Sequence, residues 1–294
     1  MIKKEFVLVH GAAHGAWCWE EVAARLRARG HHVVAPELPG HGRRAHERSR
    51  ASVASYAAAV LDAMALEGVS RGIVVGHSMG GIVIPKVAEV APARVAHLVF
   101  LAGVVLPDGG SMFEVHLSPS TRDLMAAMAR GGGNGTIPFP AAFAWSRWMN
   151  DLPPGHPVVQ AALPLLTPQP LRPFVERVDM KGFYAVSVPR TYIRCLKDVA
   201  VRPDRAAEYA RCLGVKPVDL DVAHPSSAYY SRTAMARPGG WRGVQPPRGR
   251  AQWAPLVPSA ARSAAFGRVG DGAGPTGAAP CDRPRPLHST MARE

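Results

Sequence analysis

Short apolar segments alternate with amphipathic segments along the first hundred residues. Four short runs rich in β-branched residues are typical of buried strands: Phe6–Val9, Val33–Ala35, Gly72–Val75 and Val95–Leu101. Three segments have the pattern of helices: Trp17–Arg29, Val53–Met64 with Ser52 as a candidate N-cap, and Met79–Ala91. Strands that alternate with helices at these distances predict βαβ units, and therefore an α/β fold with a mostly parallel central sheet and flanking helices.

The alternation stops near Pro107 and resumes near Arg190. The stretch between them contains helical pieces, a glycine-rich linker at Gly131–Gly135 and several prolines. We interpret residues 107–189 as a helical cap inserted over one edge of the sheet. Its aromatic residues have two interpretations, as the lining of a pocket for an acyl or aryl group or as the core of the cap: Phe139, Phe143, Trp145 and Trp148.

After the cap, the pattern returns to that of a sheet. Arg190–Cys195 and Val215–Leu220 are predicted strands, and Asp204–Leu213 is a predicted helix. Pro217 cannot donate a backbone hydrogen bond, which favours an edge position for the last strand. Residues 1–224 are therefore expected to form one α/β unit that carries the cap.

Residues 225–294 differ sharply in composition from the rest of the chain. They contain ten prolines, nine glycines and ten arginines against three acidic residues, so about +7 of the formal net charge of +13 lies there. Large apolar residues are too few to offset the entropy lost on ordering, and we predict a disordered tail. A frameshift at or just after His224 in a GC-rich gene would give this composition. The alternative is a native basic tail that binds acidic partners or nucleic acid, of which nucleic acid is the less expected partner.

Composition sets further limits on the class of protein. The chain has 294 residues, of which 47% are hydrophobic, enough for a sizeable core. No apolar stretch of about 18 residues predicts a membrane span, and the first residues run directly into a strand without the features of a signal peptide. The four cysteines lack metal-ligand spacing, so we interpret them as reduced thiols of a cytoplasmic protein.

A G-x-S-x-G sequence, Gly76–Gly80, lies between a predicted strand and a predicted helix. This is the pattern of a nucleophile elbow, in which the serine occupies a strained turn with its Oγ exposed. Glycines are needed on both sides because a Cβ there would crowd the strand and the helix. The start of the helix directs N–H groups at an oxyanion formed beside the serine. Ser78 is therefore the candidate nucleophile.

A serine hydroxyl is a weak nucleophile until a base accepts its proton and an acid orients that base. In sheets of this kind the order along the chain is Ser, then Asp or Glu, then His. Two histidines follow the last predicted strand, His224 and His288. We predict His224 as the base because it comes directly after a strand end. Asp198, which follows another strand, is the predicted acid, and three rivals stay open: Asp204, Asp219 and Asp221.

Two backbone N–H groups are expected to form the oxyanion hole. Ala12, in the loop after the first strand, supplies one, since Gly11 beside it allows a close approach, and Met79 supplies the other. His10 and His14 do not predict a metal site, because their spacing in a loop does not place them on one face. No cofactor and no metal are expected.

Four segments resemble one branch of the α/β-hydrolase superfamily, the plant-type methylesterases and hydroxynitrile lyases. They are similar to that branch's opening strand and loop, its elbow, its acid-bearing strand and its histidine loop: Phe6–Trp17, Gly76–Gly81, Ser187–Asp198 and Asp221–His224. The resemblance covers about residues 5–224. It implies the α/β-hydrolase fold and the same triad and oxyanion-hole residues as above.

Two departures from that branch bear on the predicted activity. The lyases carry a threonine where this chain has Gly11 and a lysine where it has Pro225, and both positions serve cyanohydrin cleavage. The resemblance therefore implies hydrolysis of a small carboxylic ester through an acyl-enzyme on Ser78. Lyase-like activity and an inactive, ligand-binding protein of the same fold are the alternatives, and a homodimer stays open.

Overall fold

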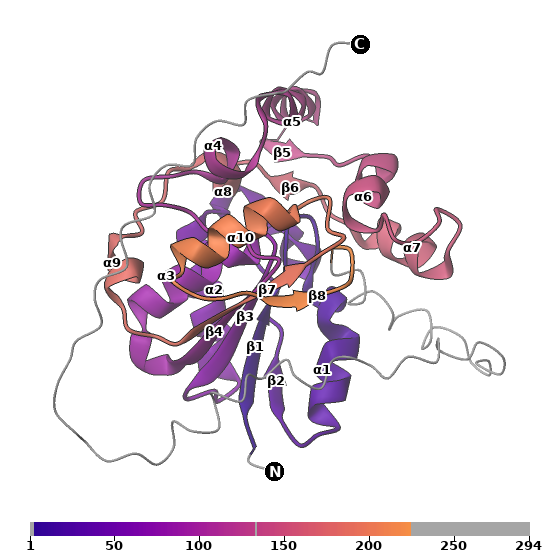
Figure 1. Ribbon diagram of the computed structural model, residues 1–294. Helices are drawn as coiled ribbons and strands as arrows, with labels where there is room; N and C mark the ends of the chain where they lie inside the picture. Colours follow the sequence, from indigo (N-terminus) through magenta and orange to yellow (C-terminus); the bar gives the residue numbers. More distant parts are fainter. Residues whose placement is uncertain (1–2, 133, 225–294) are drawn as a thin grey trace, which may run out of the picture.

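The computed structural model describes residues 3–132 and 134–224 (Figure 1). A six-stranded parallel sheet forms its centre, in the order β2-β1-β3-β4-β7-β8. Its strands are β1 (Glu5–Val9), β2 (His32–Val34), β3 (Gly72–His77), β4 (Val95–Leu101), β7 (Arg190–Cys195) and β8 (Val218–Leu220). The predicted α/β fold class is confirmed. The predicted disorder of residues 225–294 lies outside the described residues.

Helices cover both faces of this sheet: α1 (Glu20–Arg27), α2 (Val53–Leu66), α3 (Gly80–Val90) and α10 (Pro203–Cys212). Helix α1 lies on one side, whereas α2 and α3 pack against each other on the other side (Figure 1). Strand order explains this arrangement. The connection from β1 to β2 runs toward one edge and the next connection runs back, so right-handed crossovers place the two sets of helices on opposite faces.

Local signals account for where the helices begin. Ser52 caps α2 as predicted, because its Oγ accepts a hydrogen bond from the Ser55 N–H at 3.0 Å and the Ser55 Oγ accepts one from the Ser52 N–H at 2.9 Å. The first predicted helix begins instead as a 3-10 turn, Ala16–Trp19, which leads into α1. Other 3-10 turns are Gly42–Arg50, Pro92–Arg94 and Leu163–Leu165.

The last strand is shorter than predicted. Strand β8 begins at Val218, directly after Pro217, which has no N–H to pair with a neighbouring strand. Its edge position is confirmed, since β8 pairs with β7 and is last in the sheet order. Both Val218 and Asp219 are exposed.

Between β4 and β7 the chain leaves the sheet for a set of short helices and a small hairpin. These elements are α4 (Met112–His116), α5 (Pro119–Gly132), α6 (Ala141–Trp148), α7 (Pro157–Ala162), α8 (Arg172–Val175), α9 (Lys181–Ala185), β5 (Thr136–Ile137) and β6 (Gln169–Pro170). Gly131 continues helix α5, so the predicted linker starts later than expected. A cap of residues 107–189 on a unit of residues 1–224 stays a prediction.

The aromatic residues of this segment pack mainly against one another. The Phe139 ring lies 5.4 Å from that of Phe143 and 5.0 Å from that of Trp148, centroid to centroid. Trp145 donates its indole N–H to the Leu152 carbonyl at 2.8 Å. These contacts favour the interpretation of the aromatic residues as the segment's own core.

Two further expectations concern membranes and thiols. Within the described ranges, the helices are too short or too polar to span a bilayer. Cys18 and Cys195 are buried free thiols, and burial raises the pKa of both. Cys212 is disulfide-bonded, so the expectation of four reduced thiols is wrong at that residue.

Candidate active site

Ser78 occupies the sharp turn between β3 and α3. Its φ of 51° is in the left-handed region, which is strained for a residue with a side chain. Backbone hydrogen bonds hold the turn in place. The Ser78 N–H donates to the Leu101 carbonyl at 3.1 Å, and its carbonyl accepts from the N–H groups of Gly81 at 2.9 Å and Val104 at 3.0 Å. The surrounding backbone therefore maintains a conformation that serine alone would not favour.

The two glycines of the elbow are required by close backbone contacts. A Cβ on Gly76 would lie 2.6 Å from the carbonyl oxygen of Gly80, in the first turn of α3. A Cβ on Gly80 would lie 2.8 Å from the carbonyl oxygen of Val9, at the end of β1. Strand and helix can therefore approach this closely because both positions lack a side chain.

Asp198 and His224 form a buried pair at the carboxyl ends of neighbouring strands. Their side chains are 0% and 2% exposed, and His224 Nδ1 lies 2.7 Å from Asp198 Oδ2. The other carboxylate oxygen, Oδ1, accepts from the N–H groups of Ala200 at 2.7 Å and Val201 at 2.9 Å. These three hydrogen bonds fix both the carboxylate and the orientation of the imidazole.

The rival carboxylates are engaged elsewhere. Each pairs with a basic side chain at 2.7–2.9 Å: Asp204 with Arg202, Asp219 with Arg194, and Asp221 with Lys197. Of the four acid candidates, the described structure brings Asp198 alone into contact with His224.

The elbow brings His77, the residue before Ser78, next to His224. The rings of His77 and His224 lie 4.7 Å apart, centroid to centroid, at an angle of 47°. Burial lowers the pKa of His77 well below its ordinary value, so this ring is neutral at pH 7. Among the described residues, the buried His77 Nε2 has no hydrogen-bond partner. Ser78, Asp198 and His224 thus all follow the carboxyl ends of strands of the same parallel sheet, β3, β7 and β8.

The two N–H groups expected to form the oxyanion hole lie on either side of this turn. Neither the Ala12 N–H nor the Met79 N–H donates a hydrogen bond to any described residue. The loop that carries Ala12 packs directly on the nucleophile, since a Cβ on Gly11 would lie 3.0 Å from the Ser78 Cβ and 3.1 Å from His77 Nδ1. The loop after β1 therefore lies against the serine, and the roles of the Ala12 and Met79 N–H groups stay predictions.

Gln169, which the sequence analysis did not identify, ties this loop to the segment between β4 and β7. Its Oε1 accepts from the Ala13 N–H at 3.0 Å and lies 3.0 Å from His41 Nε2. The Ala13 carbonyl accepts from the Thr167 N–H at 2.9 Å. These contacts keep Ala13 at its positive φ of 59°, next to Ala12. No local signal could have identified Gln169, because it is 156 positions from Ala13 in the sequence.

His10 and His14 have structural partners rather than the geometry of metal ligands. His10 Nε2 accepts from the Leu38 N–H at 3.2 Å, so its Nδ1 carries the proton and donates to the Gly11 carbonyl at 2.9 Å. His14 Nδ1 lies 2.6 Å from the Ala12 carbonyl, and burial lowers the pKa of His14 to about 3. Across the described ranges, no group of three or more metal-binding side chains occurs.

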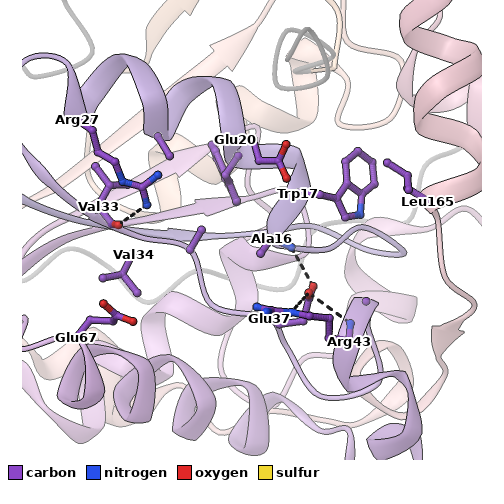
Figure 2. A pocket seen from close by; sticks show the side chains of 14 residues that line it. Ala16, Trp17, Glu20, Arg27, Val33, Val34, Glu37, Arg43, Glu67 and Leu165 are labelled. Atoms are coloured by element: carbon purple, nitrogen blue, oxygen red, sulfur yellow. Dashed lines mark hydrogen bonds and ion pairs between the residues drawn. The ribbon is translucent and has the colours of Figure 1, made fainter. Parts of the chain in front are cut away.

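A separate cavity of about 640 Å³ lies against the outer part of the same loop (Figure 2). Trp17, Glu37 and Arg43 line it together with residues of α1 and β2. The cavity is not lined by the serine, the buried pair or the two unpaired donors. The Glu37 carboxylate in this cavity accepts hydrogen bonds from the Ala16 N–H at 2.9 Å and the Arg43 N–H at 3.5 Å. It therefore anchors the end of the loop after β1.

Comparison with known proteins agrees with this fold. Residues 6–237 match the model of the alpha/beta hydrolase family, and the chain belongs to that family. The match continues thirteen residues beyond His224. The frameshift there stays a hypothesis about residues outside the described part of the chain.

Several relatives are esterases. Methylesterase 7 of Arabidopsis thaliana is 30% identical over 213 residues, which cover 69% of this chain and 81% of the relative. A carbendazim hydrolyzing esterase of Nocardioides sp. (strain SG-4G) is 41% identical over 108 residues, 36% of this chain and 45% of that enzyme. The chain spans 61% of the length of another relative, the putative methylesterase 14, chloroplastic, of Arabidopsis thaliana. The resemblance to plant methylesterases and esterases is confirmed at distant identity.

Solved structures show the same fold. An extracellular alpha/beta-hydrolase from a Paenibacillus species superimposes with a TM-score of 0.68 at 26% identity, over 75% of this chain and 91% of that one. It is described as sharing structural and functional homology with tobacco salicylic acid binding protein 2. A pyrethroid hydrolase from Sphingobium faniae JZ-2 gives a TM-score of 0.61 at 25% identity, over 79% of this chain and 93% of that one.

Proposed function

We propose that the chain is a serine esterase that cleaves a small carboxylic ester through an acyl-enzyme on Ser78. One observation carries the proposal: the buried contact of 2.7 Å between His224 and Asp198, beside a serine held at positive φ. Membership of a family with esterase relatives supports the same reaction class.

In this mechanism His224 is the general base and Asp198 orients it. His224 accepts the hydroxyl proton as the Ser78 oxygen attacks the ester carbonyl carbon. The negative charge that develops on the carbonyl oxygen is stabilised by the N–H groups of Ala12 and Met79. When the tetrahedral intermediate collapses, the proton passes from His224 to the leaving alkoxide. A water molecule, activated by His224 in turn, then hydrolyses the acyl-enzyme and releases the acid.

The surroundings of Asp198 and of the two backbone N–H groups suit the roles proposed for them. Asp198 already accepts two backbone hydrogen bonds, which hold its carboxylate in a fixed orientation toward the His224 imidazole. The donors of the oxyanion hole are backbone groups whose positions are fixed before the reaction, and each such donor is worth about 3–4 kcal/mol of barrier.

The lyase alternative is not favoured by the space around Gly11. A side chain there would press on the Ser78 Cβ at 3.0 Å, so the threonine of the lyases cannot be accommodated without a shift of the loop. We therefore propose ester hydrolysis, without a metal or cofactor, as the activity.

A fluorescent fluorophosphonate tests this proposal. Purified full-length protein should be labelled covalently, and Ser78→Ala should abolish the label. Hydrolysis of p-nitrophenyl acetate should be lost in the same variant. A folded parent protein that takes no label and hydrolyses no ester would refute the proposal and leave the ligand-binding alternative.

A further inference from the structure

A second pocket, of about 220 Å³, lies between the segment that follows β4 and the core helix α10. Its walls come from the α4–α5 junction, from α6, from the loop after Asp198 and from α10: His116, Leu117, Ser118, Thr121, Arg147, Val199, Ala200, Arg202, Asp204, Arg205 and Glu208. Neither Ser78 nor His224 lines it. It is also smaller than the roughly 300–1,000 Å³ typical of sites for drug-sized ligands.

The charged side chains of this pocket do not balance. Two of its three arginines are paired with carboxylates of the same wall, Arg202 with Asp204 at 2.9 Å and Arg205 with Glu208 at 2.5 Å. The third, Arg147 on α6, has neither an ion pair nor a side-chain hydrogen bond among the described residues. The pocket therefore has one more guanidinium than carboxylates. The five N–H donors of the Arg147 guanidinium suit a planar or tetrahedral oxyanion.

Other polar groups that line this pocket also suit an anion. Ser118 and Thr121 present hydroxyls at the start of α5, a helix of 14 residues whose N-terminus carries a positive partial charge. The Ser118 Oγ caps that helix by accepting from the Thr121 N–H at 3.2 Å, and it also lies 2.8 Å from Thr121 Oγ1 and 3.1 Å from Ser120 Oγ. One proton of the Ser118–Thr121 pair is used between the two hydroxyls, which leaves the other for an anion. His116 holds the Tyr209 hydroxyl at 3.1 Å, and burial lowers the pKa of His116 to about 4, so its ring is neutral at pH 7.

We propose that this pocket binds a small oxyanion, a carboxylate or a phosphate, with Arg147 as its cationic anchor. The anion would lie between the unpaired guanidinium and the hydroxyls of Ser118 and Thr121. It would thereby join the segment between β4 and β7 to the loop of Val199 and Ala200. The N–H of Ala200 is one of the two that hold Asp198, so occupancy stabilises the support of the predicted catalytic acid.

Calorimetric titration of the full-length protein tests this inference. Sodium acetate and sodium phosphate are titrated separately at pH 7, with sodium chloride added to hold the ionic strength constant. Saturable binding of one anion or both is expected. Binding of acetate alone identifies the carboxylate as the ligand class, and binding of phosphate alone identifies the phosphate.

Substitution of the anchor makes the test specific. Arg147→Gln should weaken binding about tenfold or more, because a charge-assisted hydrogen bond is lost. Arg130→Gln is the matched control, since Arg130 is exposed on α5 and does not line the pocket. Arg147→Lys, which keeps the charge but loses the planar fork, should bind more weakly than the parent and serves if the glutamine variant does not fold. No saturable binding by the parent, or equal binding by the Arg147 variants, would overturn the proposal.

Discussion

Replacing Gly76 with alanine tests whether the elbow depends on the close approach of strand and helix. The added Cβ would lie 2.6 Å from the Gly80 carbonyl oxygen, whereas real Cβ contacts are essentially never shorter than 3.0 Å. The start of α3 must therefore move away from β3 by at least about 0.4 Å. Because the opposing atoms belong to the backbone, no rotation of a side chain relieves the clash.

The expected loss of stability follows from that shift. Overpacking of this kind costs about 1–3 kcal/mol, and alanine returns about 0.4–1 kcal/mol by restricting the unfolded chain. The net decrease in the free energy of unfolding is then up to about 2.6 kcal/mol, or up to about 10 °C in Tm for a domain of this size. The same movement displaces the Met79 N–H, so fluorophosphonate labelling of Ser78 should slow about tenfold.

Urea unfolding and labelling kinetics measure both effects on the same samples. Gly131→Ala is the matched control, since a Cβ at Gly131 meets no atom within 4 Å and the residue lies in helix α5. That variant should be more stable by about 0.5–1 kcal/mol and label at the parental rate. If Gly76→Ala had the urea midpoint and labelling rate of the parent, the argument from close contact would be wrong.

Three other predictions follow from the described contacts. Asp198→Asn should lower the rate of ester hydrolysis about 10⁴-fold with the fold intact, as in serine proteases, and a circular dichroism spectrum checks the fold; a loss below tenfold would contradict its role. Glu37→Ala leaves the Ala16 N–H without its acceptor and should destabilise the protein by about 1–3 kcal/mol in urea unfolding, whereas Glu37→Gln keeps an acceptor and should cost less. Equal losses would refute the anchoring role. Burial holds the pKa values of His14 at about 3 and His116 at about 4, below the ordinary 6.5, so the unfolded chain binds more protons in that interval. Stability should therefore be full above pH 6.5 and fall as the pH is lowered from about 6.5 toward 3; an unchanged urea midpoint between pH 7 and pH 5 would contradict this.

The parts of the site that the sequence predicted are those with local signals. The residues of the elbow are contiguous in the sequence. Its glycines indicate a tight turn, and its serine indicates a nucleophile. Asp198 and His224 could be chosen because each follows a strand, and parallel strands bring their carboxyl ends to one edge. The resemblance to methylesterases pointed to the same residues. The roles of these residues in catalysis stay predictions until labelling is measured.

What the sequence could not predict depends on contacts between distant segments. Gln169 accepts a hydrogen bond from Ala13 in the loop after β1, 156 positions away in the sequence. No sequence pattern around a buried glutamine indicates which residue it will contact. Glu37 accepts a hydrogen bond from the N–H of Ala16, 21 positions earlier in the chain. The sequence around Glu37 indicates an ordinary turn. The disulfide bond of Cys212 was missed because no sequence spacing indicated it.

The position of the candidate base, His224, depends on β8, the strand at one side of the sheet. His224 follows a strand of three residues, β8, which among the described residues pairs with β7 alone. Two side chains of β8 are exposed. Such an edge opens at a lower free energy than the buried centre of the sheet. Activity on heating should therefore disappear before the sheet melts, and backbone amide exchange of β8 should be faster than that of β1 and β3. An inactivated protein that still holds its nucleophile turn would regain activity on cooling without refolding its core.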